Sequence, residues 1–390
     1  IGSLTVAKTT DSMDSLIALK KRGDANGVET KILSKEETLK LEPLLKDDII
    51  GSLFAPSCGI IDPFNLVTHA VECAINNGVE LHLEEEVISI RPGKEIEVTT
   101  NSSSYKTKVL VNSAGLQSAN IAKLIDPNFD LEITPRKGQY YVLDNNISLV
   151  NHVCFALPNK LGKGVLVSKT TSGNFIIGPN NTLGDSLDDV STDTNSLNEI
   201  KEKSLINFST IPFASTIRVF SGIRPSLESE NDFYIKQSFG CRNAINLIGI
   251  DSPGLVSSPA IAEYVFDLLE NILKPKIKKS FNPYVKKYIV MNNLSTEEKD
   301  KIIANDRDFG KIVCFCERIS LGEIKNILSR NIPINSIKAL KKRTRAGFGS
   351  CQGGFCLPTM VSLLSKSSRI KMEDILLDKN GSYILVGLAK

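Results

Sequence analysis

Tryptophan is absent from this 390-residue sequence, which contains only three histidines and four methionines. No apolar run approaches the ~18 residues that a membrane-spanning helix needs, so we expect no direct membrane insertion. The formal net charge of +3 is too small to indicate a nucleic-acid partner. The sequence also lacks the G-x-G-x-x-G pattern that follows the first strand of many dinucleotide-binding units.

The residues that are present are typical of a globular protein with more than one domain. The hydrophobic fraction is 41% and the charged fraction 23%, both ordinary values. Strands and helices alternate up to about residue 285, which favours a sheet with helical cover plus antiparallel strands from a second domain. Ser34 followed by Glu37 predicts a capped helix start. The expected strands are residues 79–83, 108–115, 139–144, 174–179, 232–235 and 245–250, and the expected helices are residues 35–42, 62–78 and 258–273.

The segment 62–78 has the clearest helical pattern, with a proline in its first turn and a glycine at its end. Its apolar residues recur at helical spacing and should form its core-facing side: Leu66, Val67, Ala70, Val71 and Ala74. His69 falls off this side, so we expect it in solvent. His82 alternates to the outer side of the strand expected at 79–83.

A change in composition near Asn282 divides the chain. Residues 1–285 form the mixed α/β part, and the polar, charged segment 286–310 is typical of a linker with a short helix. Residues 311–365 form a small domain that holds four of the eight cysteines. The tail, 366–390, contains one weak strand.

The cysteines of the small domain form two tight pairs. One residue separates Cys314 from Cys316, 34 residues follow, and four residues separate Cys351 from Cys356 in a glycine-rich loop. Four thiolates can hold a zinc ion or an iron–sulfur cluster. The C-x-C spacing is tighter than structural zinc sites usually show, and glycines let backbone N–H groups approach cluster sulfurs. Four buried free cysteines are the alternative without a metal.

Two stretches of this region, "CFCERISLGEI" and "KALKKRTRAGFGSCQGGFC", resemble the BFD-like [2Fe–2S]-binding domain. The resemblance covers about 50 residues and implies that Cys314, Cys316, Cys351 and Cys356 ligate a [2Fe–2S] cluster. The basic residues before the glycine loop have two open interpretations. They are cations that favour the reduced cluster and steer an acidic partner, or they form an ordinary solvated face. These residues are Lys338, Lys341, Lys342, Arg343 and Arg345.

The larger part resembles the FAD-dependent oxidoreductases related to D-amino-acid oxidase and glycerol-3-phosphate dehydrogenase. The matching stretches occur in family order: "SCGIIDPF", "VNSAGLQSANIAKL", "TPRKGQYYVLD", "SGNFIIGP", "FSGIRPS" and "GIDSPGLVSSPAIAEYV". The resemblance implies an α/β (α+β) fold: a Rossmann-like FAD-binding domain, interleaved with an antiparallel-sheet substrate domain, and then the small helical [2Fe–2S] domain. It also implies that the first βαβ unit lies upstream of Ile1, so we expect an N-terminally truncated fragment.

This resemblance implies a set of FAD contacts. In "VNSAG", small residues after a strand let the backbone approach a phosphate or ribityl chain, and an ordinary strand-to-helix turn is the alternative. "DSPGLV" precedes a helix whose N-terminal amides would stabilise the negative charge of reduced flavin. The implied cofactor-binding residues are Val87, Ala114, Gly115, Gly222, Ser252, Gly254, Leu255 and Val256.

Arg224 in "SGIRP" is the candidate for binding the substrate anion. An arginine can hold a phosphate or carboxylate through two parallel hydrogen bonds, and a surface salt bridge is the alternative. The family position places this arginine at the substrate. Lys137 and Tyr140 of "RKGQYY" are expected in the same cavity, and His152 is the one histidine kept as a candidate base.

A flavoprotein part, a linker and a BFD-like domain together resemble the large, catalytic subunits of anaerobic glycerol-3-phosphate dehydrogenases. That resemblance implies a small anionic substrate, sn-glycerol 3-phosphate, oxidised by FAD to dihydroxyacetone phosphate. Electrons would pass through the cluster to a flavoprotein partner or a quinone-reducing subunit. We therefore expect a cytoplasmic protein that reaches the inner face of the membrane only through that partner. Dehydrogenases of 2-hydroxy acids and of opines or amino acids share the architecture, and a non-catalytic iron–sulfur carrier with a relic flavin domain is a further alternative.

Overall fold

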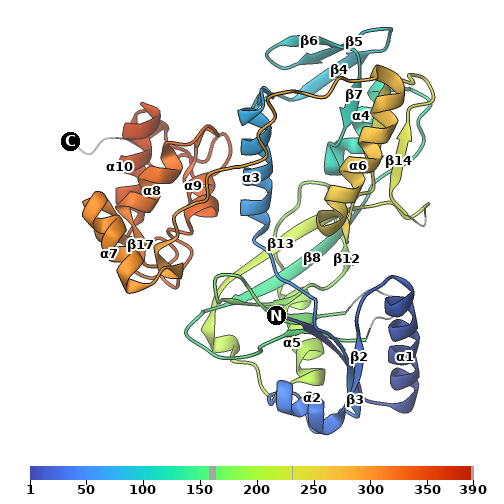
Figure 1. Ribbon diagram of the computed structural model, residues 1–390, viewed down its shortest axis with the longest axis vertical. Coiled ribbons are helices and arrows are strands. Elements are labelled where there is room, and N and C mark those ends of the chain that lie inside the picture. Colours follow the sequence, from blue (N-terminus) through green and yellow to red (C-terminus); the bar gives the residue numbers. More distant parts are fainter. Residues whose placement is uncertain (158–163, 231, 388–390) are drawn as a thin grey trace. The chain divides into compact units, whose positions relative to one another are not determined.

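The computed structural model describes residues 1–157, 164–230 and 232–387. The chain packs into two compact units, each with its own hydrophobic core (Figure 1). Unit 1 comprises Ile1–Ile60 and His82–Lys279, and unit 2 comprises Ile61–Leu81 and Ser280–Lys390. Residues 61–81 therefore pack with the cysteine-containing end of the chain, although the segments on both sides of them belong to unit 1.

Unit 1 is built on a nine-stranded sheet. Eight strands follow one another across it: β12 (Thr182–Leu183), β8 (Thr134–Leu143), β11 (Phe175–Gly178), β10 (Leu166–Lys169), β9 (Val153–Phe155), β1 (Ser3–Ala7), β3 (Gly51–Ala55) and β2 (Lys31–Ser34). The ninth strand, β13 (Thr216–Ser226), pairs antiparallel with β8 from end to end. Only β1 and β9 are parallel neighbours in this sheet. The β8–β13 ribbon thus presents alternate side chains on two opposite faces.

One face of this sheet is covered by α5 (Thr194–Asn207), which packs on β8 and β11. The core there includes Leu143, Ile177 and Ile200, all fully buried. Two helices, α1 (Thr10–Ala25) and α2 (Lys35–Leu41), pack against β1, β2 and β3.

The predicted capping box at the start of α2 is confirmed. The Ser34 N–H donates to the Glu37 carboxylate at 2.8 Å, and the Glu37 N–H donates to Ser34 Oγ at 3.2 Å. These two bonds satisfy amides that the first helical turn would otherwise leave without partners.

Two smaller sheets complete unit 1. The first contains β14 (Tyr234–Gln237), β15 (Ala244–Ile248) and β7 (Leu110–Asn112), in that order. A turn of 3-10 helix, η1 (Gly115–Gln117), leads from β7 into α4 (Ser118–Ile125), and β15 leads into α6 (Gly254–Leu273). The second sheet is an antiparallel meander of β4 (Val87–Arg91), β5 (Ile96–Thr100) and β6 (Ser104–Thr107).

Two strand predictions are wrong. Residues 79–83 are exposed and form no strand, because no neighbouring strand pairs with their backbone in the described part of the chain. In the described part of the tail, up to residue 387, the expected strand is reduced to a single bridge between Tyr383 and Leu376, and its last residues lie outside the described ranges. The helix expected at 258–273 begins earlier, at Gly254, because the chain enters it directly from the turn after β15.

Unit 2 is mainly helical. Its elements are α3 (Pro63–Asn76), η3 (Met291–Asn293), α7 (Thr296–Asn305), η4 (Arg307–Gly310), β16 (Ile312–Cys314), β17 (Ile319–Ser320), α8 (Leu321–Leu328), α9 (Ile337–Thr344), α10 (Leu357–Ser368) and η5 (Met372–Asp374). Ile324, Leu340, Met360 and Leu364 are fully buried in its core. No helix in the described ranges of either unit is long and apolar enough to cross a bilayer.

The predicted orientation of α3 is wrong. The only buried residue of this helix is Glu72, whereas Val67 on the expected core-facing side is 53% exposed. His69, expected in solvent, is half-buried, and its ring centre lies 4.3 Å from that of Tyr288. The polar side of α3 therefore packs in unit 2.

Candidate active site and cysteine cluster

Four of the cysteines of unit 2, Cys314, Cys316, Cys351 and Cys356, lie as two close pairs. Cys314 and Cys356 are buried, Cys351 is half-buried and Cys316 is exposed. Burial and the adjacent Cys314 thiol raise the pKa of Cys356 to about 12. Burial also acts to raise the pKa of Cys351, but hydrogen bonds from loop amides and from Cys316 outweigh it and lower that pKa. Cys314 thus neighbours Cys356, and Cys316 neighbours Cys351.

The glycine-rich loop passes too close to Cys316 for any side chain. A β-carbon on Gly349 would lie 2.3 Å from the Cys316 β-carbon. The Gly347 N–H donates to the Cys314 sulfur at 3.4 Å, from a backbone with φ of +83°. The Ser350 hydroxyl donates to the Cys316 sulfur at 3.8 Å. Donors of this kind stabilise thiolates and an anionic cluster.

This donor set fits a [2Fe–2S] cluster. Each iron of such a cluster takes two thiolates, and the two adjacent cysteine pairs can supply them. Among the described residues, no three His, Cys, Asp or Glu side chains converge on one position suited to a single metal ion. Four thiolates in two pairs, with nearby N–H and O–H donors, are the ligand set that this cluster needs.

The basic residues before the loop make specific contacts within unit 2. Arg345 donates to the Glu317 carboxylate at 2.9 Å, and Lys338 forms an ion pair with Asp378. Arg343 is only 8% exposed. The interpretation of this run as an ordinary solvated face is therefore wrong for Arg343, whereas the side chains of Lys338 and Arg345 stay 40% and 30% exposed in their ion pairs.

The segments expected to contact FAD meet at the carboxyl ends of two parallel strands, β7 and β15. Asn112 and Asn246 are opposite each other there, and the Asn112 side-chain amide donates to Asn246 Oδ1 at 2.9 Å. Beyond these residues, the chain turns at Ala114 and Gly115 toward α4 and at residues 249–254 toward α6. Ligands of open α/β sheets bind at this position.

The geometry of these turns leaves backbone available to a ligand. Gly115 has φ of +57°, and no atom lies within 4 Å of where its β-carbon would be. Gly254 is buried at the start of α6, while the next residues, Leu255 and Val256, are 45% and 79% exposed. The Gly254 N–H donates to the Asp251 carbonyl at 2.5 Å, so the amides left for an electronegative group are those of the next residues, because the first amides of a helix have no partners within it. Ser252 lies in the same turn.

Val87 begins β4 and belongs to the hydrophobic cluster that also contains Ile121 of α4. The meander therefore packs beside the helix that follows the Ala114–Gly115 turn. Val87, one of the implied FAD contacts, therefore lies on the same part of unit 1 as the turn at Ala114 and Gly115.

Arg224 and Tyr140 lie on one face of the β8–β13 ribbon. Arg224 is opposite Arg136 and Phe220 is opposite Tyr140, so these four side chains share a face. The Tyr140 and Phe220 rings stack 4.9 Å apart at 8°. Burial raises the pKa of the Tyr140 phenol, against the opposing effect of Arg224.

Two glycines form the middle of this face. Gly138 and Gly222 are opposite each other, and no atom lies within 4 Å of a β-carbon built on Gly222. Arg224 Nη2 lies 3.3 Å from the β-carbon position of Gly138, and it donates to the Asn180 carbonyl at 3.2 Å and to Asn181 Oδ1 at 3.1 Å. The face thus offers open space above Gly222, bordered by a cation and an aromatic stack.

Lys137 lies on the opposite face of the ribbon. It is 6% exposed, and its amino group donates to Asp189 at 2.7 Å and to Ser191 at 3.1 Å. The alternation of β8 therefore separates it from Arg224 and Tyr140, contrary to the expectation of one shared cavity.

His152 is held at a different place on the sheet. Glu42, 1% exposed, accepts hydrogen bonds from the His152 backbone N–H and from its ring Nδ1, both at 2.7 Å. The strand register across β9, β10 and β11 places His152 level with Leu143, whereas Arg224 is opposite Arg136. Seven residues of strand separate those levels, on the order of 20 Å, so the structure does not bring His152 to Arg224.

Sequence reasoning missed Phe220, Asn180 and Asn181. Phe220 lies two and four residues before Gly222 and Arg224, so all three point to the same face of a strand. This alternation was the signal that could have indicated Phe220. Asn180 and Asn181 follow β11 and reach Arg224 only through the fold, so no local pattern could have indicated them.

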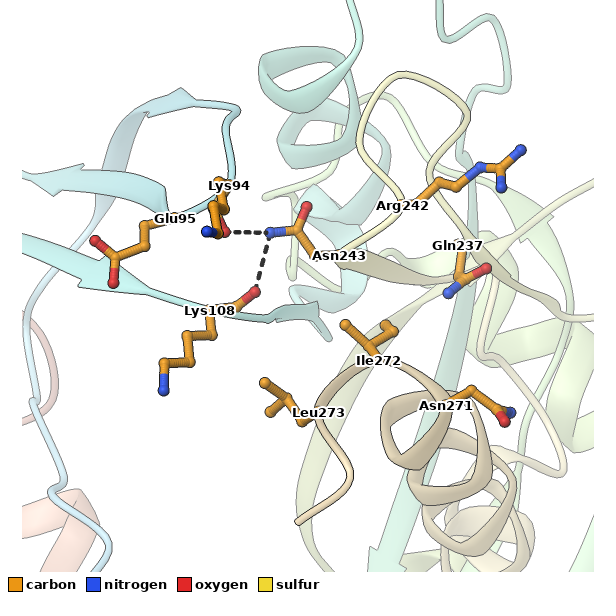
Figure 2. Close-up of a pocket in the computed structure, with 9 residues that line it drawn as sticks. All are labelled: Lys94, Glu95, Lys108, Gln237, Arg242, Asn243, Asn271, Ile272 and Leu273. Carbon is orange, nitrogen blue, oxygen red and sulfur yellow. Dashed lines mark hydrogen bonds between the residues drawn. The ribbon is translucent and has the colours of Figure 1, made fainter.

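A separate pocket of about 910 Å³ opens at the amino ends of β7 and β15, beside the last turn of α6. Figure 2 shows Asn243 donating to backbone carbonyls of Lys94 and Lys108, which closes one side of it. The lining residues are Lys94, Glu95, Lys108, Gln237, Arg242, Asn243, Asn271, Ile272 and Leu273. No expected FAD or substrate residue is among them, and the flavin-side turns lie at the other end of these strands.

Two family models match the chain. The model described as FAD dependent oxidoreductase matches residues 1–268, and the BFD-like [2Fe-2S] binding domain matches residues 312–366. The chain therefore belongs to the FAD-dependent oxidoreductases and carries a [2Fe–2S]-binding domain. It is an oxidoreductase whose cofactors are FAD and a [2Fe–2S] cluster, as the sequence led us to expect.

Individual relatives narrow the comparison. The chain is 42% identical over 396 residues to a glycerol 3-phosphate dehydrogenase of Caloramator mitchellensis, covering 100% of this chain and 82% of that protein. It is 22% identical over 379 residues to one subunit of the anaerobic glycerol-3-phosphate dehydrogenase of Escherichia coli, covering 87% and 68%. Its fold is similar to that of L-alpha-glycerophosphate oxidase from Mycoplasma pneumoniae with FAD bound, with a TM-score of 0.69, 30% identity and coverage of 74% and 77%.

Proposed function

We propose that this flavoenzyme oxidises sn-glycerol 3-phosphate to dihydroxyacetone phosphate. The observation that carries the proposal is the open face above Gly222, bordered by Arg224 and by the stacked rings of Tyr140 and Phe220. A space of this kind suits a small polar substrate with an anionic end. The names of the C. mitchellensis and M. pneumoniae relatives support glycerol phosphate as that substrate.

Arg224 binds the phosphate in this proposal. Its Nε donates to the Arg136 carbonyl at 3.4 Å, and Nη2 is held by Asn180 and Asn181. These bonds fix the plane of the guanidinium before substrate arrives, which lowers the entropy cost of orienting the anion. These three bonds do not use Nη1, whose two N–H donors point along fixed directions and can bind phosphate oxygens.

Tyr140 acts as a hydrogen-bond donor rather than as a base. Because burial raises the pKa of its phenol, the hydroxyl stays protonated at neutral pH. Bound FAD would supply the acceptor for the hydride that leaves the carbinol carbon of the substrate. The turns at Gly115 and Gly254 are the expected backbone contacts for this cofactor, and the helix start at Gly254 favours the negative charge of its reduced form.

The oxidation releases two electrons and two protons per substrate molecule. A [2Fe–2S] cluster held by the four cysteines would supply one-electron transfer, so the two electrons would leave in two steps to an acceptor outside this chain. In this proposal the acceptor is a flavoprotein or a quinone-reducing subunit, and this chain lies on the cytoplasmic side of the membrane. The BFD-like domain and the likeness to part of an anaerobic dehydrogenase support this assignment.

Substrate-dependent reduction of an artificial dye tests the proposed function. The holoprotein should reduce the dye with sn-glycerol 3-phosphate and should act poorly on glycerol, which lacks the anion. L-2-hydroxyglutarate, an opine and an amino acid serve as the competing substrates. Faster turnover of any of these three than of sn-glycerol 3-phosphate would contradict the proposal.

A further inference from the structure

Glu72 of α3 is a buried carboxylate paired with Arg330. The side chains are 7% and 6% exposed, and Arg330 Nε donates to the two carboxylate oxygens at 2.9 and 3.0 Å. Both residues belong to unit 2. A buried carboxylate as the one buried residue of a helix is unusual, because desolvating a charge is costly unless a partner compensates it.

Two further side chains complete the surroundings of this ion pair. The Arg330 guanidinium lies 4.4 Å from the centre of the Tyr288 ring and also donates to the Lys286 carbonyl. The Tyr288 hydroxyl donates to Thr68 Oγ1 of α3 at 3.3 Å. We call Glu72, Arg330, Tyr288 and Arg343 the α3 clamp.

Arg343 joins the clamp from α9. Its Nη1 donates to the Ile332 carbonyl at 2.9 Å, and the guanidinium is buried near Tyr288, Glu72 and Arg330. Burial lowers the pKa of Arg343, against the favourable effects of Tyr288 and Glu72. The clamp thus contains two buried cations, and Glu72 is the carboxylate that acts on both of them.

The clamp is continuous with the cysteine loop. Arg343 lies in α9, which ends at Thr344 and leads directly into the loop that carries Gly347 and Cys351. The next arginine, Arg345, pairs with Glu317, the residue after Cys316. A change at Glu72 would therefore act on both segments that hold the cluster ligands.

In sequence, α3 lies between two segments of unit 1. The chain enters α3 from Ile60 and returns to unit 1 at His82. The flavoenzyme family match also includes this helix, since it covers residues 1–268. One helix therefore belongs to the flavoenzyme segment by sequence and to the cluster-bearing unit by packing.

We propose that Glu72 is a positioning residue: through the α3 clamp it fixes α9 and the cysteine loop within unit 2, and so sets the rate at which the cluster accepts electrons. In the holoprotein, the cluster would accept one electron at a time from reduced FAD, with one of its two irons going from ferric to ferrous. This inference rests on the proposed electron route of the enzyme, but not on the identity of the substrate.

Glu72→Gln tests the proposal because it keeps the shape and hydrogen-bonding capacity of the side chain but removes the charge. In the holoprotein, flavin is reduced by a light flash with a sacrificial donor, and cluster reduction is then followed by absorbance. We expect the variant to retain its iron, to have its flavin reduced at the wild-type rate, and to pass electrons to the cluster at least about tenfold more slowly. Hydrogen exchange at residues 63–76 should also become faster.

Two further variants control the test. Glu297→Gln makes the same chemical change at an exposed site of unit 2 and should match the wild type in every measurement. Glu72→Gln combined with Arg330→Gln should be less impaired than the sum of the single changes, because the two residues act as one pair. Wild-type transfer and exchange in Glu72→Gln would overturn the proposal.

Loss of iron in parallel with loss of transfer would also overturn it, because Glu72 would then be needed only for folding. A different result would contradict the hypothesis about the substrate. Flash-driven cluster reduction without any reduction by sn-glycerol 3-phosphate would contradict the proposed function and leave the α3 clamp intact.

Discussion

Tyr140 and Phe220 stack face to face, 4.9 Å apart and 8° from parallel, on neighbouring strands of the β8–β13 ribbon. The next pair along the ribbon on the same face is Gly138 and Gly222, and beyond it lie Arg136 and Arg224. A stacked aromatic pair, a glycine pair with open space above Gly222, and a pair of arginines therefore follow one another at intervals of two residues. The predictions for the substrate site follow from this order.

Replacing Arg224 with lysine keeps the charge but loses the planar pair of donors. We expect kcat/KM for sn-glycerol 3-phosphate to fall about 10- to 100-fold, as for a lost charge-assisted hydrogen bond of ~1.5–3 kcal/mol. FAD content should be unchanged. Arg91→Lys, at an exposed site on β4, is the matched control. Steady-state kinetics equal to the wild type in Arg224→Lys would mean that this arginine is structural.

Gly222→Ala directly tests the role of the open space above Gly222. The free enzyme has room for the new methyl group, so the melting temperature should stay close to that of the wild type. The methyl group would occupy the space above Gly222, which we assign to substrate or flavin. We therefore expect a higher KM or a lower FAD content. Titration with substrate and with FAD measures both. Unchanged values for the two ligands would place the binding site elsewhere.

The ion pair of Lys137 and Asp189 should make the free energy of unfolding depend on pH in the acidic range. The hydrogen bond from Lys137 lowers the pKa of Asp189 well below its usual range. A carboxyl group with a lower pKa in the folded state than in the unfolded state stabilises the fold above the unfolded pKa of ~3.9, and that contribution is lost as the pH falls below it. The melting temperature should therefore fall more steeply with decreasing pH for the wild type than for Asp189→Asn.

This ion pair should not affect substrate binding, since Lys137 faces away from Arg224. We expect Asp189→Asn to keep the wild-type KM, and Asp14→Asn, at an exposed site, to keep the wild-type acid dependence as well. A raised KM in Asp189→Asn would indicate that Lys137 does contribute to the substrate cavity.

Gly349→Ala should abolish the cluster. A β-carbon there would lie 2.3 Å from that of Cys316, so the loop must move away from this ligand. Iron content and the visible absorbance of the cluster should be lost, while flavin reduction by substrate continues. Cys58→Ser changes a thiol of unit 1 and should leave the iron content unchanged. Full iron loading of Gly349→Ala would show that these cysteines do not hold the cluster as we describe.

Local patterns in the sequence were sufficient for features that depend on nearby residues. The Ser34–Glu37 capping box needs only the spacing of two side chains, and the two cysteine pairs are marked by their own spacing and by glycines. Likewise, the parallel strands β7 and β15 end in the turns that the sequence motifs indicated.

Features that depend on distant partners could not be predicted in this way. The apolar side of α3 indicated the wrong buried face, because Arg330, 258 residues away, pairs with Glu72. Lys137 and Tyr140 stand close together in sequence, but the register of β8 with β13 puts them on opposite faces. His152 looked available as a base until the fold placed it against Glu42.

The central claim is that substrate electrons enter through FAD and reach the [2Fe–2S] cluster of the same chain. Anaerobic mixing of the oxidised holoprotein with sn-glycerol 3-phosphate, followed by optical and paramagnetic resonance spectra, tests it most directly. The account predicts bleaching of the flavin and then a paramagnetic signal from the reduced cluster, with dihydroxyacetone phosphate as the product. An oxidised flavin and a silent cluster after mixing, in protein that dithionite reduces fully, would contradict it.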